Sequence, residues 1–131
     1  MQNASAKSTP ISISQAFGAI KFLPNRTPEA NGNNDGFCSL AAYRDGGIFL
    51  AHYAGNSEWE RHTTGDEMVM VMEGETTLML LQNGEEVANF MPQGTLLIVP
   101  KNIWHRFESP KGVKIMTITP QPTDHSVDRP E

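Results

Sequence analysis

The chain has 131 residues, the size of one domain, and a net charge of −5 without any cluster of Lys and Arg, which argues against nucleic acid as a partner. No apolar run approaches the roughly 20 residues of a membrane-spanning helix, so no membrane partner is predicted, and the first residues lack the apolar segment of a secretory signal. Cys38 is the only cysteine, which excludes an internal disulfide. These features together predict a protein of the reducing cytoplasm.

The first third of the chain contains little that predicts regular structure. Residues 1–10 are small and polar and predict a flexible tail. Residues 11–14 alternate apolar and polar side chains, which predicts a short edge strand. Residues 24–36 combine two prolines with a run of Asn and Gly and predict a loop. No window of about 12 residues has a helical period, so no helix is expected.

From residue 37 onward, strand patterns recur about every 8 to 12 residues between turn residues. The clearest turn is Asn83-Gly84, because both central residues of a type I′ hairpin need positive φ. We expect an all-β domain of about ten strands over residues 11–120, followed by an extended C-terminal tail at 121–131. Periodicity leaves a sandwich, a jelly roll and a barrel open. Besides 11–14, the expected strands are 37–44, 48–54, 59–62, 67–72, 76–81, 86–91, 95–99, 103–107 and 113–119.

Four potential metal ligands lie on strand faces among apolar neighbours, because alternate side chains of a strand share a face. Glu60 and His62 share one face of their strand, and Glu67 and His105 lie beside apolar residues on theirs. If these faces all point inward, the four side chains meet in one pocket. Two carboxylates in an apolar pocket repel each other and lose hydration, so they need compensating charge. A divalent cation supplies it, and so does a protonated Glu or a His⁺–Glu pair.

The order and spacing of these residues resemble the two motifs of the cupin superfamily. The first motif has a Gly, His-x-His, a Glu and a second Gly, and it corresponds to Gly55, Glu60-x-His62, Glu67 and Gly74. In this chain Glu60 replaces the first His. The resemblance covers roughly residues 37–119. It implies a double-stranded β-helix, or jelly-roll barrel, with a pocket for a small molecule and a homodimeric assembly.

The second cupin motif has a Gly, Pro-x-Gly, a His and an Asn. It corresponds to Gly94, Pro100, Asn102, His105 and Ser109. Asn102 replaces a Gly, and Asn tolerates left-handed φ better than most residues. With both motifs present, the resemblance implies Glu60, His62, Glu67 and His105 as ligands of one divalent metal ion. This ligand set suits Fe²⁺, Mn²⁺, Ni²⁺, Zn²⁺ or Co²⁺. The alternative is a metal-free core in which these residues bond to one another.

Two classes of function remain open. In the first, the protein is a metal-dependent enzyme on a small organic substrate, with Glu60 and Glu67 as catalytic carboxylates. Iron would favour a dioxygenase, and Zn²⁺ or Mn²⁺ an isomerase. In the second, it is a metal-free or non-catalytic module that binds a sugar or a small acid. A structural role ranks below both.

Other residues are expected to serve packing. His52 is expected to be a structural histidine, and His125 in the C-terminal tail is expected to have no role. Cys38 is expected to be a buried small residue. The stripe Met68, Met70 and Met72 is expected to form a packing surface, between sheets or between subunits. Trp59 and Trp104 are likewise expected to pack away from the ligand positions.

Overall fold

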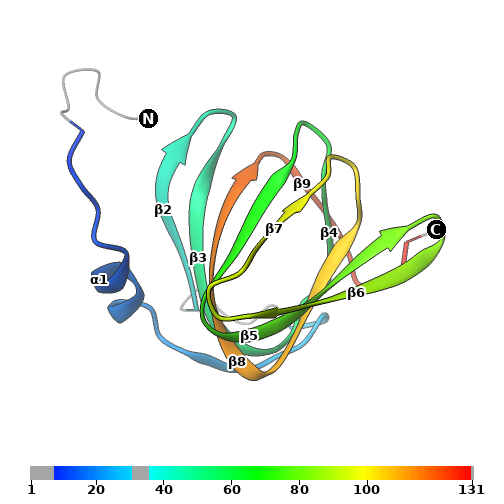
Figure 1. The fold of residues 1–131 in the computed structure, drawn as a ribbon, viewed down its shortest axis with the longest axis horizontal. Coiled ribbons are helices and arrows are strands. Elements are labelled where there is room, and N and C mark those ends of the chain that lie inside the picture. The colour runs from blue at the N-terminus through cyan, green and yellow to red at the C-terminus, as the bar shows by residue number, and fades with distance from the viewer. Residues whose placement is uncertain (1–7, 31–35, 131) are drawn as a thin grey trace.

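A computed structural model describes residues 8–30 and 36–130, so residues 1–7 of the expected tail and 31–35 of the expected loop lie outside the described residues. The described residues form mainly β-strands with one short helix, which confirms the all-β prediction (Figure 1). The elements are α1 (Ile13–Gly18), β1 (Leu23–Arg26), β2 (Phe37–Tyr43), β3 (Gly46–Asn56), β4 (Trp59–His62), β5 (Glu67–Gln82), β6 (Glu85–Pro92), β7 (Leu96–Val99), β8 (His105–Pro120) and β9 (Thr123–Ser126).

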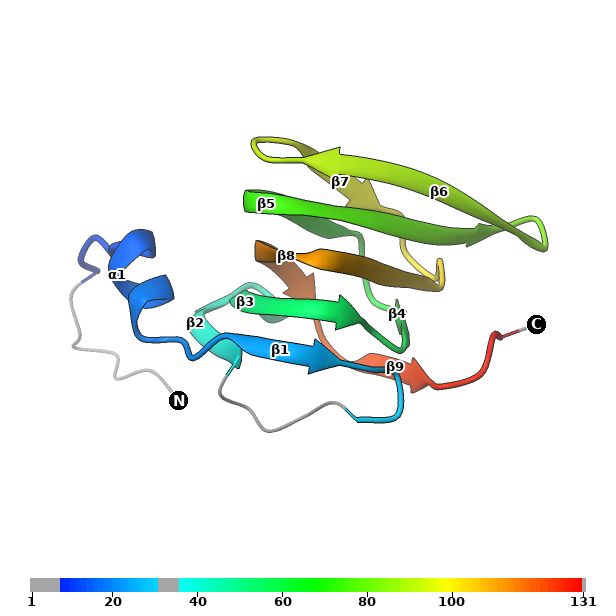
Figure 2. The same cartoon turned by 90° about the horizontal axis from the view of Figure 1, so that it is seen from below.

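The strands form one nine-stranded sheet, in which the central strand β8 pairs antiparallel with β3 on one side and β5 on the other. At one end of these three strands, β6 pairs with β5 and β1 pairs with β3. As a result β6, β5, β8, β3 and β1 lie side by side (Figure 2). At the other end of the three strands, β7 pairs with β5 and β2 pairs with β3. The long strands therefore belong to two layers. The result is the expected jelly roll, with the sheet not closed into a barrel.

β5 and β8 each continue through a break that the sequence predicts. Gly74 and Gly112 have φ of 78° and 95°, and a Cβ on Gly74 would lie 2.4 Å from the carbonyl oxygen of Gly112. The β5–β8 pairing shifts register between Val71 and Glu73, and again before Thr77. The two strands bend together where glycine permits positive φ and close backbone approach. The prediction that each strand ends here is therefore wrong.

Two asparagines adopt the left-handed conformation expected of them. Asn83 and Gly84 have φ of 53° and 77° and form the two-residue turn between β5 and β6, which confirms the hairpin. Asn102 has φ of 70°, and its backbone N–H donates to the carbonyl of His62 at 2.9 Å. The turn before β8 is thereby joined to the end of β4.

The N-terminal region differs from its prediction. The prediction of an edge strand at 11–14 is wrong, because α1 begins within this segment. The Ser12 hydroxyl caps the helix by accepting from the backbone N–H of Gln15 at 3.2 Å, and Phe17 is buried. A four-residue alternation cannot outweigh such a cap. The loop expected at 24–36 begins instead as β1, whose Arg26 lies opposite Gly55 in a parallel pairing with β3.

The segment expected to be a C-terminal tail contributes strand β9, which pairs antiparallel with β4. The guanidinium of Arg61 donates twice to the Asp124 carboxylate, at 3.0 and 2.7 Å. In the same pairing Glu60 lies opposite His125. β9 is therefore positioned to add residues to the site formed by β4.

The alternation predicted for β5 is present. Glu67, Val69 and Val71 are buried, whereas Met68 and Met70 are half-buried on the opposite, outer face. The methionine stripe thus lies outside, not between the two layers. No helix in the described part of the chain is long and apolar enough to cross a membrane. The main buried cluster consists of Tyr53, Val69, Val71, Leu78, Leu80, Met91, Val99, Phe107, Val113 and Ile115.

Candidate metal centre and cavity

The inner faces of the sheet line a cavity of about 730 Å³ that is open to solvent. Its polar lining comes from strands that are far apart in sequence, from β1 to β9, and its apolar lining comes mainly from β2, β3 and β8. The charged and titratable lining residues include Arg26, Tyr53, Glu60, His62, Glu67 and His125.

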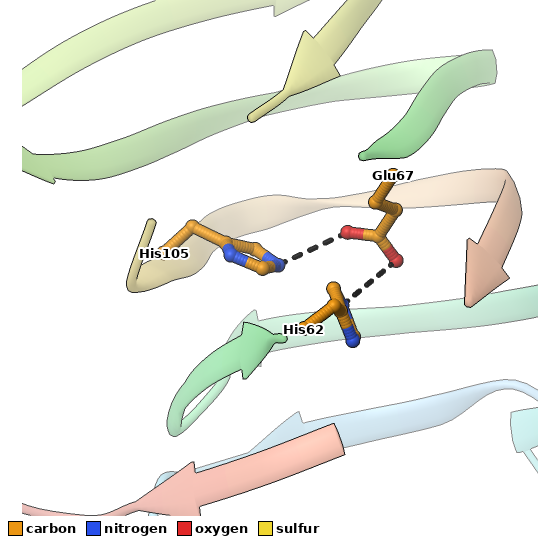
Figure 3. Close-up of side chains that lie close together, drawn as sticks. All are labelled: His62, Glu67 and His105. Carbon is orange, nitrogen blue, oxygen red and sulfur yellow. Dashed lines mark ion pairs between the residues drawn. The ribbon is translucent and has the colours of Figure 1, made fainter. Parts of the chain in front are cut away.

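Three of the four predicted ligands come together beside this cavity, and we call them the triad: His62, Glu67 and His105 (Figure 3). His62 ends β4, Glu67 begins β5 and His105 begins β8. Nε2 of His62 lies 3.4 Å from Oε2 of Glu67, and Nε2 of His105 lies 3.0 Å from Oε1. All three side chains are buried. Both imidazoles therefore point their Nε2 atoms at one carboxylate.

The neighbours of the two imidazoles determine which ring nitrogen carries a proton. Nδ1 of His105 lies 3.0 Å from the carbonyl oxygen of Ile103, which can only accept, so Nδ1 donates. Nδ1 of His62 lies 3.1 Å from the Thr123 hydroxyl, which itself donates to the side-chain oxygen of Gln121 at 3.3 Å. His62 Nδ1 is therefore also the donor. In a neutral imidazole this leaves a free lone pair on each Nε2.

These lone pairs face the carboxylate without forming hydrogen bonds. Nε2 of His62, Nε2 of His105 and Oε1 of Glu67 are buried and have no hydrogen-bond partner among the described residues. Two ligand atoms about 2.1 Å from one ion, at about 90–110° to each other, lie about 3.0–3.4 Å apart. The two nitrogen–oxygen separations in the triad, each to a different oxygen of Glu67, have these values, and one donor atom of each residue lies within 4.8 Å of the other two. The donor set and its spacing therefore fit a divalent transition metal ion.

The charges of the triad depend on one another. Burial by itself would raise the pKa of the Glu67 carboxyl, but the adjacent imidazoles of His105 and His62 outweigh it and lower that pKa to about 2. Burial would lower the pKa of His105, yet Glu67 and the carbonyl of Ile103 raise it overall. Glu67 thus stays ionised at neutral pH and stabilises positive charge between the rings. A bound cation would compete with a proton for that place.

Glu60, the fourth predicted ligand, lines the cavity but is not part of the triad cluster. Its carboxylate lies nearer to Glu58 and His125: Nδ1 of His125 is 2.5 Å from Oε1 of Glu58 and 3.7 Å from Oε2 of Glu60. Burial and the negative charge of Glu67 raise the pKa of Glu60. Glu60 therefore offers a carboxylate to the cavity that the triad does not use.

The remaining candidate residues separate into those inside and outside the cavity. His52 lies outside it and packs on Phe22 with ring centroids 4.7 Å apart, as expected of a structural histidine. His125, expected to have no role, lines the cavity. Arg26 and Thr123 were also missed as site residues. All three missed residues belong to β1 and β9, which no sequence pattern predicts as strands.

The two tryptophans that were expected to pack away from the ligand positions do so. The guanidinium of Arg106 lies 5.2 Å from the ring centroid of Trp59, and that of Arg61 lies 4.6 Å from that of Trp104. Cys38 is half-buried rather than buried and lies at the cavity wall. The stacked arginines cover the outer face of β4 and the start of β8, which leaves the inner face to the triad.

Comparison with known proteins agrees with this geometry. A family model described as a cupin domain matches residues 49–119, more than half of the chain. The chain belongs to the cupin-domain family. The matched segment of this cupin contains the whole triad and most of the cavity strands. No curated protein matches the chain.

Solved structures show the same fold. A cupin-2 domain protein from Shewanella frigidimarina is 25% identical with a TM-score of 0.54, over 65% of this chain and 79% of that one. Protein NMB1881 from Neisseria meningitidis is 22% identical with a TM-score of 0.60, over 86% of this cupin and 100% of that chain. Hydroquinone 1,2-dioxygenase PnpCD, solved with Cd²⁺ and 4-hydroxybenzonitrile, is 17% identical with a TM-score of 0.57, over 64% of this chain and 63% of that one. The last two likenesses show the fold alone.

Proposed function

We propose that this cupin binds one divalent metal ion through His62, Glu67 and His105 and uses it to bind, and to act on, a small organic molecule in the adjacent cavity. The observation that carries the proposal is the set of three buried ligand atoms, from His62, Glu67 and His105, that face one another and have no hydrogen-bond partner when the imidazoles are neutral. Buried polar atoms normally have partners, so three orphans in one place indicate a missing common partner.

Bound there, a divalent ion would supply Lewis-acid chemistry, polarising an oxygen of the bound molecule. The protein's own residues prepare the site. Ile103 and Thr123 hold the two imidazoles in the ligating tautomer. The Thr119 hydroxyl donates to Oε2 of Glu67 at 2.6 Å and orients the carboxylate. Glu60 provides the second carboxylate of the cavity, and we assign it the role of accepting or returning a proton of the bound molecule.

Metal binding can be tested directly. Elemental mass spectrometry of protein purified without a metal-affinity tag is expected to find about one ion of Fe, Mn, Ni or Zn per chain. Glu67→Gln and His105→Ala should lower metal affinity by more than the 10–100-fold typical of losing an outer partner. His52→Ala is the matched control, because His52 lies outside the cavity. If the triad variants keep the metal content of the unaltered protein, the proposal is wrong.

The sequence prediction that Glu60 is a fourth metal ligand is a separate proposal, since its carboxylate groups with Glu58 and His125. Glu60→Gln distinguishes the two roles. A ligand role predicts a large loss of metal affinity. A role in proton transfer predicts nearly unchanged affinity, with loss of any turnover found by screening substrates.

The alternative function is a non-catalytic module that binds a small ligand in the same cavity. The specific observation in its favour is that the imidazoles and Glu67 can also form a protonated, metal-free network, because Glu67 raises the pKa of His105. Protein that takes up none of the four metals on incubation, yet binds small molecules, would support this reading.

We also propose that the protein is a cytoplasmic homodimer. The free cysteine suits a reducing compartment. For the dimer, the support is the outer face of β5 and β7, where Met68 pairs with Ile98 and Met70 with Leu96. Leu96 and Ile98 are 57% and 44% exposed. A continuous apolar sheet face of this kind is typical of a subunit interface.

A further inference from the structure

An arginine that the sequence analysis missed lies at the wall of the cavity. Arg26 ends β1, and its backbone packs against Gly55 of β3. Its guanidinium carbon lies 4.6 Å from the ring centroid of Tyr53 and 4.9 Å from that of Phe37. Contacts of this kind restrict a flexible side chain at little cost in hydration, because guanidinium is weakly hydrated. Arg26 is therefore held in place rather than free to leave the cavity.

Arg26 lacks the direct carboxylate partner that three other arginines have. Arg61, Arg106 and Arg129 each form an ion pair with a carboxylate. Arg26 forms none with the described residues, and its Nε is buried without a hydrogen-bond partner among them. Arg26 is half-buried, with a buried Nε that has no partner, so a bound anion would supply the hydrogen bond that this nitrogen lacks and would offset the loss of hydration.

Tyr53 provides a second orphaned donor on the same wall. Its side chain is 1% exposed, and its hydroxyl lies near Ser109 and Arg26 but has no partner with good hydrogen-bond geometry among the described residues. Burial raises the pKa of the Tyr53 phenol, so the group keeps its proton and can donate. A planar guanidinium beside a phenol hydroxyl suits a carboxylate, which accepts from both.

The rest of the lining indicates what the carboxylate is attached to. Phe37, Phe49, Leu50 and Ile115 line the cavity with apolar surface. We propose that the cavity binds a small organic carboxylate with an apolar body, whose carboxylate is held by the Arg26 guanidinium and the Tyr53 hydroxyl. This inference rests on the proposed function and names the substrate class of the same cavity. A ligand fixed at Arg26 would present its other end to the triad in one orientation.

The test uses two acids, benzoate and 4-methylpentanoate, each paired with its uncharged amide. Binding is measured by calorimetry and amide-resolved NMR titration, on metal-loaded protein and on protein stripped with EDTA. Both acids should bind about tenfold or more tightly than their amides, and Arg26→Gln should remove that preference while leaving amide binding unchanged. Arg26→Lys should restore it only in part, since Lys lacks the planar fork. Tyr53→Phe should weaken the acids alone.

The outcomes separate this inference from the proposed function. Equal binding of acids and amides, or no binding of either acid, overturns the inference. The inference is also overturned if acid binding is lost when the metal is removed and is unchanged by Arg26→Gln, because the carboxylate then binds the ion. In that case the proposed function stands. Arg26-dependent acid binding by a protein that takes up no metal supports the carboxylate site and refutes the metal proposal. Circular dichroism of each variant checks that it is folded.

Discussion

Replacing Gly55 with Ala tests whether the close approach of β1 to β3 holds Arg26 in the cavity wall. Gly55 has φ of 116°, a value that residues with a Cβ rarely adopt. An added Cβ would lie 2.2 Å from the carbonyl oxygen of Arg26 and 2.8 Å from its backbone nitrogen. Both contacts are with backbone atoms, so no side-chain rotation can relieve them. β1 must therefore move away, and Arg26 with it.

The magnitude follows from two contributions. A residue held in an unfavourable backbone conformation costs about 1–3 kcal/mol. Overpacking against fixed atoms typically costs a further ~1–3 kcal/mol. Gly55→Ala should therefore lower the free energy of unfolding by about 2–6 kcal/mol, a large part of the roughly 5–15 kcal/mol of a typical domain.

The matched control is Gly84→Ala. Gly84 also has positive φ, 77°, but an added Cβ there would have nothing within 4 Å. It should cost only the conformational part, about 1–3 kcal/mol. Urea unfolding compares the two variants, and calorimetry compares their affinity for benzoate. Equal destabilisation, or an unchanged benzoate affinity in Gly55→Ala, would refute the idea that this contact positions Arg26.

Three further predictions concern other parts of the molecule. Thr123→Val removes the acceptor for His62 Nδ1 and should weaken metal binding about 10–100-fold. Thr64→Val removes only a hydrogen bond to the Gln121 carbonyl and should leave metal binding unchanged. Calorimetry measures the metal affinity of both variants. Burial raises the pKa of the Tyr53 phenol above the ordinary 10.0. The contribution of Tyr53 to the free energy of unfolding is therefore complete below pH 10.0 and is lost as the pH rises through the raised pKa. Tyr53→Phe should flatten this alkaline loss in urea unfolding. Leu96→Glu should halve the mass found by light scattering if the outer face joins two subunits, and Val127→Glu, also at an exposed apolar residue, should not.

The parts of the fold that the sequence predicted are those set by local chemistry. The Asn83-Gly84 turn needs only two residues that accept positive φ. The inward face of β5 follows from strict alternation of Glu67, Val69 and Val71 with methionines. Each of these features is determined by neighbours in the chain, so a short window of sequence contains the information.

The features that were missed depend on partners far away in the chain. β1 and β9 have four residues each, with no alternation that would distinguish them from loops, and they are ordered by pairing with β3 and β4. The bends at Gly74 and Gly112 resemble strand ends in sequence, because glycine weakens a strand pattern in the same way whether the strand stops or bends. Only the pairing of the two bends distinguishes these cases.

The same division explains the site. His62, Glu67 and His105 come from strands with clear patterns and from a motif spacing that the cupin family shares, so their convergence was expected. Arg26 belongs to β1, and Thr123 and His125 belong to β9. Neither segment has a strand pattern in its sequence. The residues that would hold a metal were therefore easier to predict than those proposed to select the ligand.

The charge of the cavity connects the substitution at Glu60 with the proposed ligand. A divalent ion and Arg26 would bring three positive charges, against two negative charges from Glu67 and Glu60. Such an ion would favour the ionised form of Glu60, whose pKa burial otherwise raises. One carboxylate would then neutralise the cavity. With the family's usual His in place of Glu60, a second positive charge would remain, and a dianion would fit better. Glu60→Gln should therefore shift the preference of the metal-loaded protein from benzoate towards phthalate, and an unchanged preference would show that Glu60 does not set the charge of the ligand.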